Sequence, residues 1–243
     1  MPLRFEELDF QTTPMGEISL RRRYDPAAQQ DVYEVRLGDE YLMSSLFTVA
    51  ERELATLALA RLDSPLARLD APAGGLRVLV GGLGLGYTAL AALADPRVGD
   101  VTVVEYSGPV LDWHRRELLP EAAGLATDPR CRLVQDDFFR RARAEPEVRY
   151  DAILLDIDHS PRHVLHPSHA AFYAADGLRA MSRHLADGGL FALWSDDPPD
   201  APFEAVLGQV FAERSAHPVD FPNPITGGRS SNTVYLARGV TAR

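Results

Sequence analysis

The sequence contains no lysine, because all 25 of its lysine-plus-arginine residues are arginines. A Schiff-base nucleophile, a pyridoxal anchor and the lysine of a phosphate-binding loop are therefore excluded. A single cysteine, Cys131, rules out an internal disulfide, which is typical of a reducing compartment. No apolar run approaches the roughly 18 residues of a membrane span, and the first residues lack the apolar core of a signal peptide. We therefore expect a cytoplasmic protein that does not act on a membrane.

Basic charge is also in deficit: 35 acidic residues against 25 arginines leave a formal net charge of −10. The excess is spread over the chain, and no basic segment stands out. Nucleic acid is therefore not expected as a partner, whereas a small cationic substrate would be attracted. With 243 residues, of which 46% are hydrophobic, the chain is long enough for one large domain, or for one domain with a small appendage.

The clearest break in composition is the loop-forming stretch at residues 70–75. Before it, alternating apolar residues predict three strands, and helical spacing follows them. We therefore expect a small antiparallel sheet and a helix in residues 1–70, and a second unit in residues 71–243. The strands are predicted at residues 17–24, 31–37 and 40–43, and the helix at 49–61.

The second unit alternates apolar strands with helical segments, which predicts an α/β fold with a mostly parallel sheet covered on both faces. After a last helix at 202–214, two strand-like runs at 215–221 and 232–237 predict a C-terminal antiparallel hairpin. The other strands are expected at 76–80, 101–105, 131–135, 152–156 and 190–195, with helices at 87–94, 109–118, 138–144 and 170–185.

Glycines at 81, 82, 84 and 86 form the turn between the first strand of this unit and its helix. Such a turn permits positive φ and lets a ligand approach the backbone. Glu105 ends the second strand, where it could bind ribose hydroxyls, and Asp136 and Asp137 follow the third, where one could bind an adenine amino group. Together these features indicate an adenosine-containing cofactor. Two alternatives are a hydride-carrier fingerprint on Gly84, Gly86 and Ala89, and glycines that only pack the helix on the sheet.

Several motifs together resemble the spermidine synthase-like branch of the class I S-adenosylmethionine methyltransferase fold. They are VLVGGLGLGYTAL, VTVVEYSGPVLDW, LVQDDFF, YDAILLDIDHSP, AAFYAADGLRAMSRHLADGGLFALW and PNPITGGRSSNTVYLA. The resemblance implies a Rossmann-like seven-stranded sheet with a small N-terminal β domain, and a homodimer. It also implies that Gly82, Gly84 and Gly86 face the methionine end of the cofactor, Glu105 the ribose and Asp136 the adenine.

The chain departs from this family inside the glycine turn. Aminopropyltransferases carry an aspartate there, which holds the amine of decarboxylated S-adenosylmethionine, whereas this chain has Gly84. Where the family's first helix has a Tyr-Gln-Glu run, this chain reads Ala50-Glu51-Arg52. The first departure favours the intact cofactor, S-adenosylmethionine, and therefore methyl transfer. The two departures together weaken the expectation of a polyamine synthase.

Acidic residues follow two neighbouring strands, and we expect them near the sulfonium of the cofactor. Asp156 and Asp158 occupy the place of the family's DSxDP motif, so we assign both to catalysis, with Asp156 as the general base. Asp196 and Asp197 follow the next strand and are predicted to bind the cationic acceptor. The alternative for this second pair is that it caps the next helix.

Four of the seven histidines fall between His159 and His169, directly after the predicted base. Their spacing matches no standard set of metal ligands. In the resembling family this segment is a gate over the active site, and we predict that His159 contacts the substrate. A metal site and a set of solvated loop histidines are the alternatives.

From these residues we expect a transferase that uses S-adenosylmethionine or its decarboxylated form and acts on a small amine or cationic acceptor, with methyl transfer favoured. The alternatives are a spermidine synthase-type aminopropyltransferase and a protein that binds the adenosyl cofactor without turnover.

Overall fold

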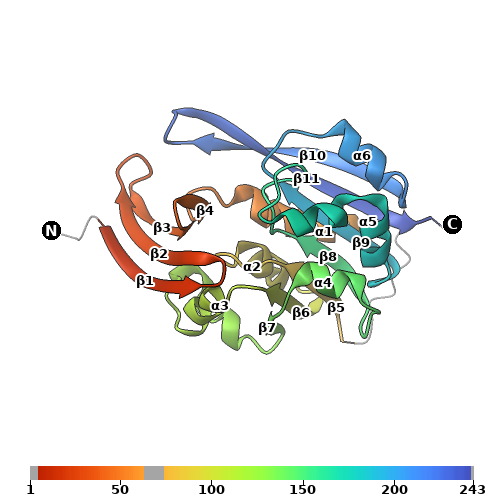
Figure 1. Cartoon of the computed structure of the whole chain (residues 1–243), viewed down its shortest axis with the longest axis horizontal. Coiled ribbons are helices and arrows are strands. Elements are labelled where there is room, and N and C mark those ends of the chain that lie inside the picture. Colours follow the sequence, from red (N-terminus) through yellow and green to blue (C-terminus); the bar gives the residue numbers. More distant parts are fainter. Residues whose placement is uncertain (1–4, 63–73, 242–243) are drawn as a thin grey trace.

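The computed structural model describes residues 5–62 and 74–241, which form two β-sheets (Figure 1). The N-terminal sheet has four antiparallel strands in chain order: β1 (Phe5–Thr13), β2 (Gly16–Asp25), β3 (Gln30–Leu37) and β4 (Glu40–Ser44). The last three confirm the predicted strands. β1 escaped prediction because none of its residues is buried, so its sequence has no clear apolar face.

The large sheet has seven strands in the order β10-β11-β9-β8-β5-β6-β7. The five strands from β9 to β7 pair in parallel, and β11 pairs antiparallel with both β9 and β10. This confirms the predicted α/β fold with a C-terminal hairpin. The strands are β5 (Leu76–Gly81), β6 (Val98–Glu105), β7 (Cys131–Gln135), β8 (Tyr150–Leu155), β9 (Leu185–Ser195), β10 (Phe211–Asn223) and β11 (Gly228–Val240).

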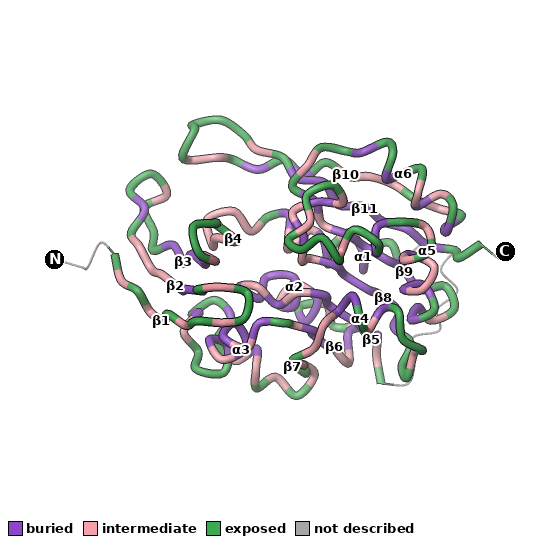
Figure 2. Tube along the Cα trace, in the orientation of Figure 1, coloured by how far each residue is buried: buried purple, intermediate pink, exposed green. Residues whose placement is uncertain are grey.

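Helices cover both faces of this sheet, and each face has its own hydrophobic core. Val78 and Val80 of β5 point into one core, and Leu79 between them points into the other, as the alternation of a strand requires. Figure 2 shows the buried residues concentrated along the central strands. The first core contains α1 (Val49–Leu62), α2 (Tyr87–Ala94) and α3 (Gly108–Arg115); the second contains α4 (Phe138–Arg143), α5 (Ala175–Ser182) and α6 (Ala201–Leu207).

Two predicted helices are shorter than the sequence indicated. The segment 170–185 divides into a 3-10 helix (Pro167–Tyr173) and α5, because Ala174 between them is extended. The helix at 202–214 ends at Leu207, and the chain enters β10 at Phe211. The fully buried Phe211 belongs to the second core, so tertiary packing places this segment in the sheet.

Helix α1 packs against α2 and β9, so the helix predicted for the N-terminal unit lies on the large sheet. The expected boundary between residues 70 and 71 falls within 63–73, outside the described residues, and the two-domain division stays a prediction. Within the described chain, no helix is both long and apolar enough to cross a membrane.

The N-terminal sheet is tied to the large sheet through Asp9 of β1. Trp113 of α3 donates a hydrogen bond from Nε1 to Asp9 at 2.6 Å, and Arg116 pairs with the same carboxylate at 3.3 Å. Burial opposes ionisation of Asp9, but these donors outweigh it and hold its pKa below the usual value. This contact sets where the β1–β2 turn lies relative to the carboxyl end of the large sheet.

Candidate functional site

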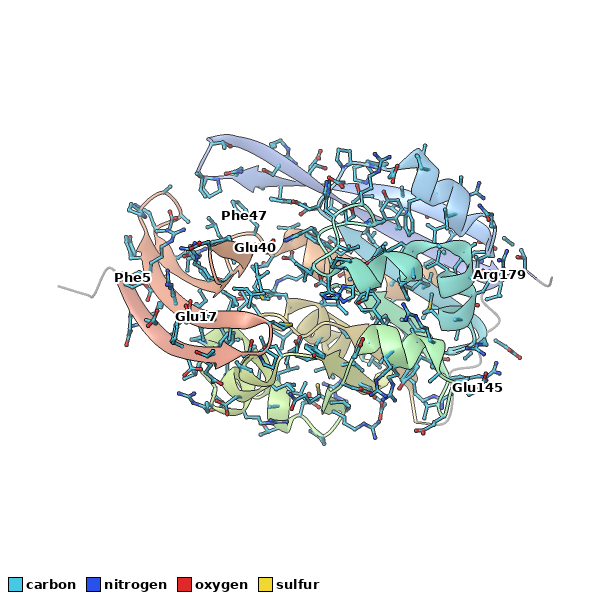
Figure 3. All side chains as sticks on the ribbon, in the orientation of Figure 1. Phe5, Glu17, Glu40, Phe47, Glu145 and Arg179 are labelled. Atoms are coloured by element: carbon cyan, nitrogen blue, oxygen red, sulfur yellow. The ribbon has the colours of Figure 1, made fainter. Side chains whose placement is uncertain are left out.

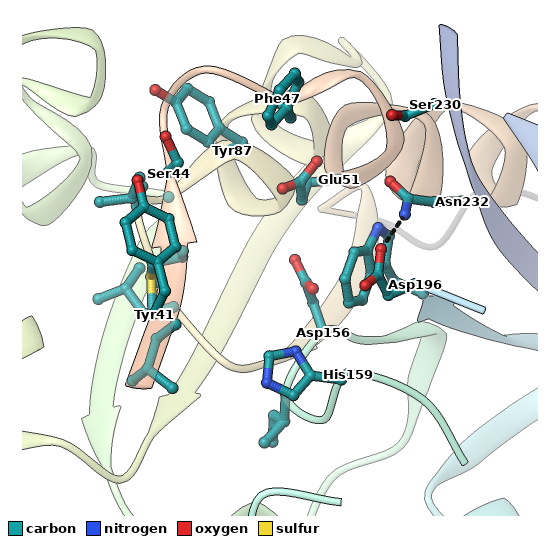
Figure 4. A pocket seen from close by; sticks show the side chains of 18 of the residues that line it. Tyr41, Ser44, Phe47, Glu51, Tyr87, Asp156, His159, Asp196, Ser230 and Asn232 are labelled. Atoms are coloured by element: carbon teal, nitrogen blue, oxygen red, sulfur yellow. Dashed lines mark hydrogen bonds between the residues drawn. The ribbon is translucent and has the colours of Figure 1, made fainter. Parts of the chain in front are cut away.

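A cavity of about 530 Å³ opens where the central strands end and the N-terminal sheet faces them (Figure 4). Ligands of open α/β sheets bind at this edge. The lining comes from β4, the start of α1, the glycine turn, the segments after β8 and β9, and β11. Figure 3 places Glu40 and Phe47 between the two sheets. Among the predicted site residues, the cavity brings together Gly84, Gly86, Asp156, His159 and Asp196.

Gly84 and Gly86 line this cavity with φ of +50° and +94°, as a ligand-binding turn requires. A Cβ on Gly84 would lie 3.2 Å from Sδ of Met43, so β4 fills the space where a side chain of the turn would point. A Cβ on Gly86 would lie 2.9 Å from Cε1 of His114.

Gly82 does not line the cavity. Its φ is +90°, and a Cβ there would lie 2.1 Å from the carbonyl oxygen of Asp156. Gly82 lets the ends of β5 and β8 approach, and its predicted contact with the methionine end of the cofactor stays a prediction. This close approach places Asp156 beside the glycine turn.

Asp156 follows β8 and lines the cavity. Its Oδ2 accepts a hydrogen bond of 2.8 Å from Oγ1 of Thr88 on α2. Burial raises the pKa of Asp156, and the bond from Thr88 only partly opposes this. A carboxyl with a raised pKa in a cavity is a candidate proton acceptor.

Glu51 of α1 also lines the cavity, and sequence reasoning did not select it as a site residue. Burial, together with the nearby charge of Asp156, raises the pKa of Glu51. The available signal was its position on the helix, because Leu54, Ala55 and Ala58, three, four and seven residues on, are all buried. An acidic side chain is unusual on the apolar face of a helix, and the structure explains its presence because Glu51 lines the cavity.

Asp196 lines the cavity opposite Glu51, and its Oδ1 accepts a 2.7 Å hydrogen bond from Nδ2 of Asn232 on β11 (Figure 4). Its backbone N–H donates to the carbonyl of His159 at 2.7 Å. Nε2 of His159 lies 3.5 Å from Oε1 of Glu40 on β4. The segment after β8 is thus held to both β9 and the N-terminal sheet.

Asp158 does not reach the cavity lining. Its fully buried carboxylate accepts hydrogen bonds from Tyr173 Oη at 2.8 Å, Leu165 N at 2.7 Å and a ring nitrogen of His169 at 2.9 Å. Asp158 thus anchors the segment that carries His159, and its predicted catalytic role stays a prediction. The sequence could not separate it from Asp156, since both follow the same strand.

Asp197 also lies outside the cavity lining. It accepts hydrogen bonds from Ser160 and His163, which lower its pKa against the opposing effect of burial. Its carboxylate thus contacts the segment after β8, and its predicted contact with the acceptor stays a prediction. The alternative of a helix cap is wrong for both Asp196 and Asp197, because Asp200 occupies the N-cap position of α6.

The remaining histidines of this segment contact neighbours within the protein. His163 contacts Ser160 and Asp197, and His166 contacts Ser168. His169 stacks on Phe139 with ring centroids 3.9 Å apart. Across residues 5–62 and 74–241, no three His, Cys, Asp or Glu side chains are grouped so that they could hold a metal ion.

A second cavity, of about 680 Å³, lies at the ends of β6 and β7 under the β1–β2 turn. Asp136 and Asp137 line it, as an adenine site requires. Asp136 pairs with Arg140, and Asp137 accepts the backbone N–H of Arg140 and so caps α4. Residues from the end of β1 and the β1–β2 turn, which the sequence did not place at the site, also line this cavity: Gln11, Thr12, Thr13, Pro14 and Met15.

Glu105 lines neither cavity and lies beneath the glycine turn. Its two carboxylate oxygens accept hydrogen bonds from the backbone N–H groups of Leu83 at 2.9 Å and Ser107 at 2.7 Å. Burial raises the pKa of Glu105, although these bonds oppose the rise. In this arrangement Glu105 holds the glycine turn against β6, and the predicted contact with ribose stays a prediction.

The first cavity is lined by acidic residues. Among the residues that the structure describes, its lining contains Glu51, Asp156 and Asp196 but no arginine. Aromatic side chains complete the wall: Tyr41, Phe47, Tyr87, Trp194 and Phe221. Carboxylates and aromatic rings both favour a cation, so this cavity is suited to an amine.

Two curated relatives cover part of the chain. The polyamine aminopropyltransferase of Mycobacterium tuberculosis is 28% identical over 121 residues, which are 49% of this chain and 22% of that protein. The polyamine aminopropyltransferase of Bacillus mycoides is 31% identical over 115 residues, which are 47% of this chain and 39% of that protein. The chain thus matches well under half the length of either relative. No family model matches it.

Solved structures match nearly the whole chain. A spermidine synthase in complex with the transition-state analogue AdoDATO has a TM-score of 0.69 at 17% identity, covering 97% of this chain and 73% of that one. Human methyltransferase-like protein 13 in complex with SAH has a TM-score of 0.59 at 20% identity, covering 78% and 82%. The predicted resemblance to the spermidine synthase-like branch of the class I methyltransferase fold is confirmed.

Proposed function

We propose that this protein transfers an alkyl group from an adenosyl sulfonium donor to the nitrogen of a small cationic amine, and that the group is aminopropyl. The observation that carries the proposal is the cavity lined by the glycine turn and by Asp156, Glu51 and Asp196, with no arginine among its described lining residues. The names of the curated relatives, both polyamine aminopropyltransferases, support aminopropyl transfer over the methyl transfer that the sequence favoured.

The residues present fit such a donor. Gly84 and Gly86 offer a turn without side chains, and Asp136 and Asp137 offer acceptors for an adenine amino group in the neighbouring cavity. When bound, the donor supplies an electrophilic carbon attached to a sulfonium that leaves as a neutral thioether. S-adenosylmethionine and its decarboxylated form both meet this description.

The protein's own task is then to hold the amine and remove a proton from it. An amine is protonated near neutral pH and has no free lone pair. Asp156 would bind the ammonium group and accept its proton, which frees the lone pair for attack in line with the carbon–sulfur bond. Asp196, held by Asn232, would bind a charged group of the acceptor.

Methyl transfer is the second candidate, and the environment of Gly84 favours it. The glycine turn presents no carboxylate to the donor, and Met43 of β4 packs beside it. A donor that keeps its own carboxylate meets no like charge at this point of the turn. The two functions therefore differ in which donor is used.

The test is to assay purified protein with decarboxylated and with intact S-adenosylmethionine, each with 1,4-diaminobutane or spermidine as the acceptor. We expect an aminopropylated product from the decarboxylated donor, detected by mass spectrometry. A methylated amine formed only from the intact donor would overturn aminopropyl transfer in favour of the second candidate.

Two variants complete the test. Asp156→Asn should lower turnover by about 10²–10⁴-fold, the usual contribution of a general base. Asp187→Asn, an exposed residue of β9 outside the cavity, is the matched control and should leave turnover unchanged. Donor binding without transfer to any amine would support the non-catalytic alternative.

The homodimer and the cytoplasmic location stay predictions. Measurement of the size of the protein in solution would test the first, and localisation in cells would test the second.

A further inference from the structure

Glu51 lies in the first turn of α1, where the sequence offers an ordinary structural explanation for it. Thr48 and Glu51 have the spacing of a capping box, in which the glutamate reaches back to the backbone N–H of the cap residue. Among the hydrogen bonds of the described residues, none joins the Glu51 carboxyl to that N–H. Figure 4 shows the carboxyl directed into the cavity, above that of Asp156.

The next residue, Arg52, does not neutralise this carboxyl by pairing with it. Its guanidinium pairs with Glu121 at 2.9 Å and lies over the ring of Tyr87, 4.8 Å from the centroid. The cavity therefore keeps the charge of Glu51 available to a ligand, and the arginine beside it is used elsewhere.

Thr88 links Glu51 and Asp156 through one hydroxyl group. Its Oγ1 lies 2.8 Å from Oδ2 of Asp156 and 3.2 Å from the backbone oxygen of Glu51. A hydroxyl has one hydrogen to donate, and the shorter contact favours Asp156. One oxygen of Asp156 is thus oriented by α2, while the Glu51 carboxyl projects from α1.

We propose that Glu51 is a second catalytic carboxyl, which takes the proton from the acceptor ammonium while Asp156, oriented by Thr88, holds the nitrogen in place. This inference rests on the proposed function but transfers the ammonium proton to Glu51 instead of Asp156, whose carboxylate then binds and orients the nitrogen. In the step, an N–H bond of the ammonium breaks and an O–H bond forms on Glu51. The freed lone pair forms the new nitrogen–carbon bond, the carbon–sulfur bond breaks, and its electron pair stays on sulfur. The proton leaves Glu51 for solvent after the product departs.

The groups that face Glu51 support these separate roles for Glu51 and Asp156. Asp156 and Asp196 are acidic residues at the ends of β8 and β9. His159, Tyr41 and Tyr87 also line the cavity, and Arg52 is the neighbour of Glu51 on α1. Burial and Asp156 raise the pKa of Glu51, while Arg52 opposes the rise. A carboxyl with a raised pKa is a stronger base than an ordinary glutamate, which suits proton removal from an ammonium group.

The test compares steady-state kinetics of Glu51→Gln, Asp156→Asn and the double variant, with 1,4-diaminobutane as acceptor and whichever donor the wild type uses. Glu51→Gln should lower kcat by about 10²–10⁴-fold with a much smaller effect on KM. The double variant should lose little more than either single variant, because residues that act as a unit are not additive. Glu53→Gln, on the same helix but outside the cavity lining, is the matched control.

The pH profile supplies a readout that a structural role would not change. Burial and the charge of Asp156 raise the pKa of Glu51 to about 8, whereas burial raises the pKa of Asp156 to about 6. In the wild type kcat/KM should therefore rise as Glu51 ionises, and the residual kcat/KM of Glu51→Gln should rise at lower pH, as Asp156 ionises. A rise in KM alone, additive losses in the double variant, or an unshifted pH profile would each overturn the proposal.

Binding of 5′-methylthioadenosine, measured by calorimetry, shows whether each variant still folds and holds the nucleoside. If Glu51→Gln fails to fold, Glu51→Asp retains the carboxyl one methylene further back and should shift the pH profile and lower kcat. A wild type that transfers nothing to any amine overturns the proposed function itself. An active wild type with an equally active Glu51→Gln overturns only the role of Glu51.

Discussion

His114 donates a hydrogen bond from Nε2 to the carbonyl oxygen of Gly84 at 2.9 Å, and this bond ties α3 to the glycine turn. The carbonyl can only accept, so the ring carries its hydrogen on Nε2. Nδ1 is buried without a partner among the described residues, and burial lowers the pKa of the ring. A neutral His114 therefore positions the turn on which the donor is proposed to bind.

Replacement of His114 by phenylalanine should weaken binding of the nucleoside. We expect His114→Phe to raise the Kd of 5′-methylthioadenosine by about tenfold, since a net hydrogen bond contributes about 0.5–1.5 kcal/mol. His114→Gln, which can still donate a hydrogen bond, should lose less. Calorimetric Kd values for both variants check this, and a larger loss in His114→Gln than in His114→Phe would show that ring packing matters and the hydrogen bond does not.

An alanine at Gly82 should disrupt the site through the backbone. Its Cβ would lie 2.1 Å from the Asp156 oxygen, whereas Gly124, with a similar φ of +82°, has nothing within 4 Å. Gly124→Ala should therefore lower the free energy of unfolding by only about 1–2 kcal/mol, the cost of a left-handed residue. Gly82→Ala should lose about 3 kcal/mol or more, because overpacking adds to that cost. Urea unfolding of the two variants measures the difference.

A carboxylate at position 84 should change the choice of donor. Aspartate tolerates positive φ, and Met43, whose Sδ would lie 3.2 Å from the new Cβ, can move because its side chain is flexible. We expect Gly84→Asp to raise the kcat/KM ratio of decarboxylated to intact donor by about tenfold, or ~1.4 kcal/mol, by repelling the donor carboxylate. Gly84→Asn has the same shape without the charge and should leave the ratio unchanged. An equal shift in both variants would refute the electrostatic explanation.

Asp158 should matter to stability more than to chemistry. Asp158→Asn removes an acceptor from a buried group of three donors and should lower the free energy of unfolding by about 2–3 kcal/mol. Tyr173→Phe deletes one of these bonds and should cost about 1 kcal/mol. Denaturant unfolding of both variants is the measurement. A stable Asp158→Asn protein without activity would instead support the catalytic role predicted from the sequence.

Stability should fall as the pH rises through the range in which the cavity carboxyls ionise. The pKa values of Glu51 and Asp156 are raised in the folded protein, so the folded state keeps protons that the unfolded chain releases. The free energy of unfolding should therefore decrease from about pH 4, the ordinary carboxyl range, towards the raised pKa values. Glu51→Gln should flatten this slope and stabilise the protein at neutral pH by on the order of 1 kcal/mol. Denaturant unfolding of the wild type and of Glu51→Gln at several pH values measures these slopes. Equal slopes in the two proteins would show that Glu51 does not cause the pH dependence.

The sequence was sufficient for much of the fold. The order of strands and helices from β5 to β9, the glycine turn and the C-terminal hairpin all follow from local periodicity and glycine placement, because these patterns reflect burial along one segment. Local sequence patterns did not predict β1, nor that α6 ends at Leu207. β1 is an edge strand that forms by pairing with β2 and has no buried apolar face that a sequence pattern could reveal. Phe211 lies in the sheet because its side chain packs in the second core.

For the site, too, the sequence predicted one part and the tertiary structure decided the rest. The residue types at the strand ends, and Asp156 among them, could be selected from spacing alone. Only the tertiary structure decided that Asp156 faces the cavity while Asp158 is buried among His169 and Tyr173, since the two are separated by one residue and differ in what packs around them. The same holds for Glu51, which meets Asp156 across more than a hundred residues of sequence. Contacts between distant segments are set by how the helices pack on the sheet, and no local pattern records them.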